Sequence, residues 1–353
     1  LPVLVKKCYS RPAQNQNNNA TTTGITNDMM DYHREMPRSF SDSRYMDQDD
    51  SMDDGRGYHD LYIRLISHEP PYYAVIRNGK QIAISLINGN QINLYLAETK
   101  NGKAKLLINR PLNTIYGSSV YWLNDSKGLI IKAIVKNRGD EPKLNTVPNG
   151  PILQENLGKV SPARTYQDLL SSPYDEDLFD YYMSAQVLYV SIKGKMKKIG
   201  NPGIIRRAEP SPDGNYILME TIHRPYSYLV PIYRFPILVQ VLDSKGKTIH
   251  TLRDMPLAES IPIGRDAVIS GPRSFGWRSD VGSTIYYVNA LDEGDPNVDV
   301  PFRDELFSLS PPFTNTEAQP LIKLELRYSR VMWGDKNNAL ISARRWKERR
   351  TTM

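Results

Sequence analysis

Short apolar runs alternate with small polar turns along the chain from residue 61 onward. Several of these turns begin with an Asp or Asn and lead into an apolar strand, and the anchors are Asn78, Asp125, Asp213, Asp280 and Asp335. Units of four strands in roughly 40–50 residues are typical of β-propeller blades. A large β-sandwich is the alternative, but sandwiches do not repeat one turn motif in this way. The pattern therefore predicts an all-β chain, a β-propeller that is incomplete here and has about five readable blades.

A second set of turns supports the same fold. Gly-Lys turns follow most anchors and join two further apolar runs, which predicts hairpins over residues 94–107, 187–199 and 239–252. Trp122, Trp277 and Trp333 each stand shortly before an anchor. We expect the propeller to span 61–353.

The stretch over residues 208–238 is the most distinctive part of the chain. Pro212-Asp213-Gly214 predicts a tight turn, and the β-branched and aromatic run Tyr216–Ile222 predicts the strand that follows. Three prolines then stiffen a loop and exclude an α-helix there, at Pro225, Pro231 and Pro236.

This proline-rich loop carries the candidate site. Its polar and aromatic side chains are His223, Arg224, Tyr226, Tyr228 and Arg234. Two arginines on a stiff loop can hold an anion in fixed geometry. The same residues are also explained if the tyrosines pack against a blade edge and the arginines pair with nearby carboxylates. The sequence leaves both interpretations open.

A long insertion at 138–185 interrupts the strand pattern. Apolar residues recur at near-helical spacing in 164–182, which predicts two short helices broken at Pro173. Four acids lie in the second half, at Asp175, Glu176, Asp177 and Asp180. They fit a solvated acidic helix start better than a metal site, since no histidine is near.

Composition narrows the class of protein. The chain has 353 residues, 40% of them hydrophobic, and its net charge of +6 arises from interspersed charges. We therefore expect no nucleic-acid partner, and no apolar run approaches the ~20 residues of a membrane span.

The two ends of the chain differ from the rest. The basic cluster at 344–350 suggests a solvated linker or interface. The polar segment 1–60 predicts a disordered leader. There is no initiator Met, so we expect the chain to begin inside a longer product.

Catalytic motifs are missing from the sequence. It contains no G-x-S-x-G nucleophile elbow, no P-loop, no G-x-G-x-x-G and no H-E-x-x-H. We therefore expect no catalytic residue, no metal site and no cofactor in this chain.

Several long motifs do resemble one known family. They are PNGPILQEN (148–156), ARTYQDLLSSPYDEDLFDYY (163–182), PSPDGNYILMETIHRPYSYLVPIYRFP (210–236), MPLAESIPIG (255–264), GPRSFGWRSD (271–280), ALDEGDP (290–296) and the tail ISARRWKERRTTM (341–353). Over roughly residues 70–353 the chain resembles the β-propeller of glutamyl endopeptidase-like enzymes, a branch of the prolyl oligopeptidase family of serine peptidases.

The resemblance implies a role in peptide cleavage. Such enzymes join the propeller to a C-terminal α/β-hydrolase domain that carries Ser, Asp and His, and the propeller limits access to peptides and unfolded polypeptides. It implies export in bacteria or the plastid stroma in plants. It also implies cleavage after Glu. From the chemistry of carboxylate binding we expect Arg224 and Arg234 to bind that side chain between Tyr226 and Tyr228, with Arg273 and Arg303 as weaker candidates.

Two alternatives remain beside this hypothesis. The chain could be a stand-alone propeller that binds peptides or acts as a scaffold. It could also belong to a peptidase of the same family with another specificity. In either case the chain itself supplies no nucleophile.

Overall fold

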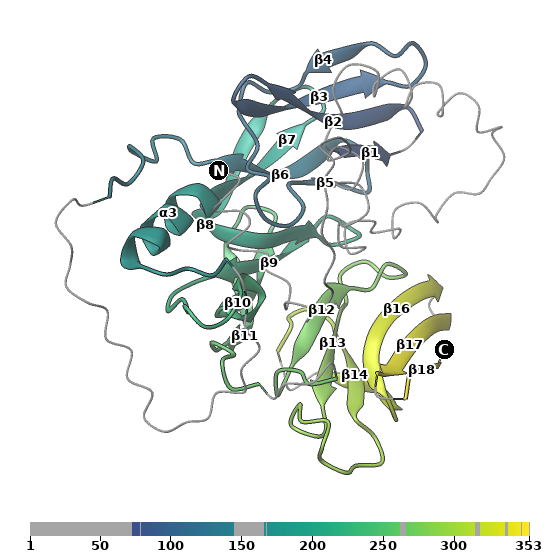
Figure 1. Ribbon diagram of the computed structural model, residues 1–353. Helices are drawn as coiled ribbons and strands as arrows, with labels where there is room; N and C mark the ends of the chain where they lie inside the picture. Colours follow the sequence, from purple (N-terminus) through teal and green to yellow (C-terminus); the bar gives the residue numbers. More distant parts are fainter. Residues whose placement is uncertain are drawn as a thin grey trace, which may run out of the picture. The chain divides into compact units, whose positions relative to one another are not determined.

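The computed structural model describes residues 73–77, 79–144, 166, 168–261, 266–314, 318–335, 338–346 and 348–352. The expected leader over 1–60 and the turn anchor Asn78 lie outside these residues. Within them, nearly all regular structure is β-strand, arranged in antiparallel sheets whose strands follow chain order (Figure 1). No helix in this part of the chain has the length and apolar character needed to cross a bilayer.

The first sheet is a four-stranded meander. It consists of β1 (Tyr73–Arg77), β2 (Gln81–Asn88), β3 (Gln91–Glu98) and β4 (Ala104–Leu106). Each strand pairs with the next in antiparallel register, and tight turns containing Gly79, Gly89 and Gly102 connect them.

The second sheet has seven strands but divides into two units of four. It runs through β5 (Val120–Trp122), β6 (Gly128–Ile134), β7 (Ala185–Ser191), β8 (Met196–Pro210), β9 (Tyr216–Ile222), β10 (Ile237–Asp243) and β11 (Thr248–Met255). The long strand β8 pairs with β7 up to Gly203 and with β9 from Ile204 onward. Its first half thus ends one meander, β5–β8, and its second half begins the next, β8–β11.

Two more sheets complete the described chain. One contains β12 (Arg273–Trp277), β13 (Ile285–Ala290), β14 (Asp304–Leu309) and β15 (Gln319–Leu324), and the other contains β16 (Arg327–Asp335), β17 (Asn338–Arg345) and β18 (Arg350–Thr352). Consecutive antiparallel meanders of four strands are the repeating unit of a β-propeller. The expected all-β propeller fold is confirmed, with five readable blades, the last of which has three described strands.

The Asp anchors form the expected turns. At Asp213 the carboxylate accepts hydrogen bonds from the amide of Asn215 at 3.1 Å and the hydroxyl of Ser211 at 2.6 Å, while Gly214 adopts φ +74°. A glycine costs little in this left-handed conformation. Asp213 also accepts a bond from Ser283 in the next blade, and the indole of Trp277 donates to the carbonyl of Glu209 at 3.0 Å. The repeated turn and tryptophan therefore join neighbouring blades.

The insertion between β6 and β7 contains a single α-helix in its described part, α3 (Pro173–Met183). The expectation of two helices broken at Pro173 is wrong, because residues 168–172 are not helical and Pro173 begins the helix. Proline is favoured in the first helical turn, where its missing N–H has no partner to lose. Ser172 caps the helix by accepting from the amide of Asp175 at 3.2 Å.

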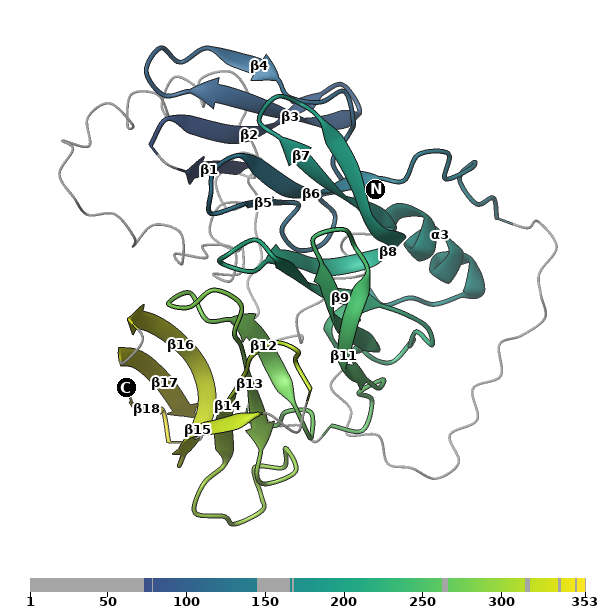
Figure 2. The ribbon, with the colours of Figure 1, turned by 180° about the vertical axis from the view of Figure 1, so that it is seen from behind.

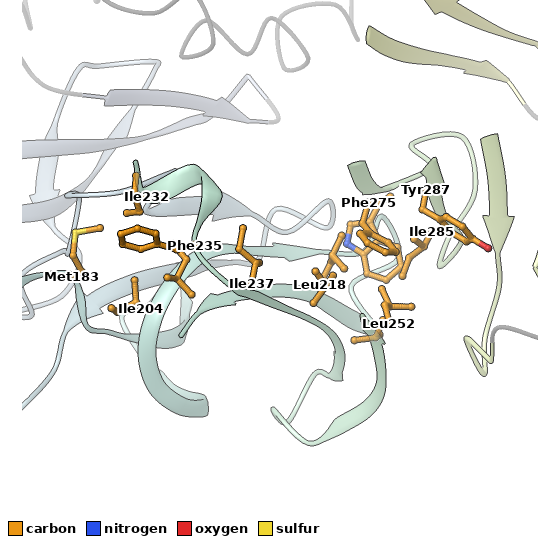
Figure 3. Packing of buried hydrophobic residues seen from close by; sticks show 14 of the residues in the cluster. Met183, Ile204, Leu218, Ile232, Phe235, Ile237, Leu252, Phe275, Ile285 and Tyr287 are labelled. Carbon is orange, nitrogen blue, oxygen red and sulfur yellow. The ribbon is translucent and has the colours of Figure 1, made fainter. Parts of the chain in front are cut away.

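A continuous apolar core links α3 to the blades. Phe179 and Met183 lie one turn apart on the buried face of the helix and pack with residues of β8–β13. Figure 3 shows these side chains spread from Met183 past Phe235 and Leu218 to Tyr287. Both ribbon views place α3 beside β8 (Figures 1 and 2). The helix is therefore part of the same core as the strands.

The C-terminal basic cluster lies in a hairpin. Arg344 and Arg345 end β17, Arg350 begins β18, and the two strands pair antiparallel. Strand pairing incorporates these residues into the last sheet, so they do not form a linker. The side chains of Arg344 and Arg350 are exposed, as expected, and the interface alternative stays a prediction. Arg345 pairs with Glu348 at 3.0 Å within the turn.

Candidate functional site

One end of the blades carries the long connections. In an antiparallel meander, the link from the second to the third strand and the link to the next sheet emerge at the same end. Three consecutive blades have extended second-to-third links: loop 135–184, which contains α3, loop 223–236 between β9 and β10, and loop 291–303 between β13 and β14. Loops that a rigid sheet holds in place are common locations for binding residues.

Loop 223–236 packs against α3 through three aromatic rings. Phe179 of the helix contacts Tyr226 edge-on, with ring centroids 4.8 Å apart, and Phe235 at 5.8 Å. Tyr226 and Phe235 stack on each other at 5.3 Å. The two connections are therefore packed together, even though they are distant in sequence.

Charged contacts reinforce this packing. The guanidinium of Arg224 donates to Asp180 from Nε at 3.2 Å and from Nη2 at 2.7 Å, and its Nη1 donates to Glu176. These hydrogen bonds, to Asp180 first, raise the pKa of Arg224 above its ordinary value. The acids of α3 thus hold the arginine from the helix side, as one of the two sequence interpretations anticipated.

Both candidate tyrosines also contact these acids. Tyr226 donates its hydroxyl to Asp180, and burial together with this bond raises the pKa of Tyr226. Burial and a hydrogen bond to Glu176 raise the pKa of Tyr228 to about 12. The structure therefore brings Arg224, Tyr226 and Tyr228 together, around carboxylates of the chain itself. No group of acids, histidines or cysteines suited to a metal occurs among the described residues.

His223 lies at the base of the same loop. Its Nε2 is 2.8 Å from Oδ1 of Asp254 on β11, and its Nδ1 is 2.6 Å from the carbonyl oxygen of Arg224. Burial alone would lower the pKa of His223, but the bonds to Asp254 and to the Arg224 carbonyl raise it. His223 therefore links the loop to β11.

Arg234 makes different contacts from Arg224. It ends a single 3-10 turn, Ile232–Arg234, and its Nη1 donates to the carbonyl of Ala258 at 3.2 Å. The amide of Ala258 returns a bond to the Arg234 carbonyl at 2.9 Å. The side chain is half-buried. Its charge is thus held by a neutral carbonyl group, in contrast to Arg224.

The two weaker arginine candidates lie in a buried ion cluster. Arg273 pairs with Asp304 at 2.6 Å and Arg303 pairs with Asp292 at 2.8 Å. Arg327 bridges both aspartates. All five side chains are buried. Their role in the described structure is to fix loop 291–303, and sequence reasoning missed Asp292, Asp304 and Arg327 because no local pattern joins them.

The chain matches two curated proteins over most of its length. It is 40% identical over 266 residues to the "Probable glutamyl endopeptidase, chloroplastic" of Oryza sativa subsp. japonica, covering 74% of this chain and 28% of that protein. It is 39% identical over 284 residues to the protein of the same name from Arabidopsis thaliana, covering 78% and 29%. No family model matches the chain.

Solved structures resemble the chain more distantly. The acylaminoacyl peptidase of Pyrococcus horikoshii is 12% identical, with a TM-score of 0.42, over 77% of this chain and 36% of that one. The β-propeller domain of the Trilobed protease from Pyrococcus furiosus is 10% identical, with a TM-score of 0.40, over 78% and 65%. Both TM-scores are below 0.5, so the assignment of a propeller fold depends on the chain's own sheets.

The sequence likeness is long and continuous across the blades. The chain spans less than a third of the length of either curated relative. Over the matched residues it belongs with the glutamyl endopeptidase-like proteins.

Proposed function

We propose that this chain is the non-catalytic propeller of a serine peptidase, which limits access to an active site on a C-terminal hydrolase domain and helps to bind peptide substrates. The observation that carries the proposal is loop 223–236. It belongs to the segment that matches the glutamyl endopeptidases, and it carries two arginines. Two ring contacts with Phe179 and the ion pairs of Arg224 fix it on α3. A fixed basic loop suits recognition of an anionic peptide side chain.

Arg234 is the better candidate for a substrate carboxylate. Arg224 already faces Glu176 and Asp180, with Asp177 3.8 Å away, so acids outnumber it and would repel a further carboxylate. Arg234 donates instead to the neutral carbonyl of Ala258. We therefore assign recognition of Glu to Arg234 and the fixing of the loop to Arg224, Tyr226 and Tyr228.

Exposed apolar side chains at the same end of the blades are suited to contact the hydrolase domain. Leu229 and Tyr233 are 51% and 52% exposed on loop 223–236. Leu291, Val298 and Phe302 are exposed on loop 291–303, which the buried ion cluster holds in place. Apolar groups on fixed loops are typical of protein contact sites. This end is where we place the contact with the hydrolase domain.

Binding of matched peptides tests the assignment of Arg234. We expect this chain to bind a peptide with a central Glu more tightly than the same peptide with Gln. The preference should disappear in Arg234→Gln, because a charged hydrogen bond of ~1.5–3 kcal/mol is lost. Isothermal titration calorimetry measures both affinities.

Arg330→Gln supplies a matched control. Arg330 is exposed on β16, so its loss should leave the Glu preference unchanged. Equal binding of the Glu and Gln peptides by the unmodified chain would contradict Glu recognition, and would favour a peptidase of other specificity or a scaffold role.

A further inference from the structure

We infer that His223 and Asp254 form a pH-sensitive latch that holds loop 223–236 on β11. The proposal deepens the proposed function, because it concerns the regulation of the loop that carries Arg234. The latch itself depends only on the contacts of His223, so it can be tested without any peptide.

The geometry requires a particular protonation state. An imidazole with one proton has one donor and one acceptor nitrogen. Both nitrogens of His223 face acceptors here, the carboxylate of Asp254 at 2.8 Å and the carbonyl of Arg224 at 2.6 Å. Both contacts are satisfied only by the doubly protonated ring. Loss of one proton therefore leaves two acceptors facing each other at one side of the ring.

The latch lies at the point where the loop begins. The amide of His223 donates to the carbonyl of Pro236 at 3.1 Å, so the two ends of the loop meet beside the ring. Asp254 pairs with Leu238 across the β10–β11 ladder and so belongs to the rigid sheet. The contact thus ties the loop base to β11.

Two charged groups act on the ring. Asp254 faces it from β11, and its attraction favours the imidazolium. The guanidinium of Arg224 follows in the chain but is directed to Glu176 and Asp180 of α3. Imidazole is the side chain that changes its charge near neutral pH, so the His223 contact can respond to a change in this range.

The direction of the response follows from the raised pKa of His223. A cationic group whose pKa is higher in the folded chain contributes its full stabilisation below the unfolded value of about 6.5. That contribution is lost as the pH rises through the folded value. The loop should therefore be held more firmly on β11 under mildly acidic conditions than under alkaline ones.

Hydrogen exchange of the loop measures how firmly the loop is held on β11. We compare residues 224–235 at pH 5.5 and pH 8.5, after correction for the intrinsic exchange rate. In the unmodified chain, protection should fall about two- to fivefold at the higher pH, the size expected for a half-exposed charge pair. His223→Gln should remove the dependence on pH. Asp254→Asn should lower the His223 pKa measured by NMR.

A control variant and two possible results test the latch. His250→Gln removes another histidine of β11 without touching the latch, and the pH response of the loop should persist in it. Unchanged protection between the two pH values in the unmodified chain would overturn the latch. So would a His223 pKa that Asp254→Asn leaves unaltered. Neither result would affect the Glu preference, so a failed latch and a failed substrate assignment remain distinguishable.

Discussion

Lys132 of β6 has 2% of its surface exposed. Its ammonium group donates to the carbonyls of Tyr116 and, at 3.2 Å, of Ile205. Burial lowers the pKa of Lys132 to about 7. Gly117 lies beside this site, and a Cβ on that residue would lie 2.3 Å from the Arg206 carbonyl oxygen.

Lys132 gives the chain a pH-dependent stability of defined sign. Between pH 7 and about 10 the unfolded chain binds one more proton than the folded chain at this residue, so stability rises with pH by up to about 1.4 kcal/mol per pH unit. Lys132→Met should lack this contribution. Urea unfolding at pH 7.5 and 9.5 measures it, and parallel behaviour of the two proteins would contradict the assigned burial.

At the residue scale, the sequence predicted a group of candidate side chains but not what they contact. His223, Arg224, Tyr226 and Tyr228 were apparent as a group because they are close in sequence. Their partners were not apparent from the sequence, because Asp180 lies 44 positions from Arg224 and Asp254 lies 31 positions from His223. Only the folding of α3 and β11 onto the loop brings them together.

At the element scale, the loop and the helix stabilise one another. Asp180 accepts bonds from both Arg224 and Tyr226, and Phe179 packs against the same tyrosine. Strand Tyr216–Ile222 was predicted correctly because alternation and β-branching are local properties. The start of α3 was not predicted correctly. Pro173 is compatible with a break in a helix or with the first turn of one, and only the cap formed by Ser172 distinguishes the two.

A double-mutant cycle tests the contact between loop and helix. Arg224→Ala and Asp180→Ala should each destabilise the chain, and their coupling energy should be about 0.5–1 kcal/mol, since both side chains are 40% exposed or more. The measurement is urea unfolding of the four proteins. Strictly additive effects would mean that the ion pair contributes nothing to holding the loop.

At the scale of the whole molecule, repetition made the fold predictable. The Asp turn and Gly-Lys hairpin recur in blade after blade, and each marks a position where a strand pair must reverse. The sharing of β8 between two blades could not be predicted, because nothing in the sequence separates Gly203 from Ile204 as a boundary. The association of long connections with one end follows only from the observed strand order.

Whether this propeller serves a serine peptidase can be tested on the natural protein that contains residues 1–353. We would isolate that protein with an antibody to the propeller, measure its intact mass and treat it with a fluorophosphonate probe for active serines. We expect a mass well above the 40.3 kDa of this chain, and covalent labelling outside it. A protein of larger or equal mass that the probe does not label would mean that this propeller does not serve a serine peptidase.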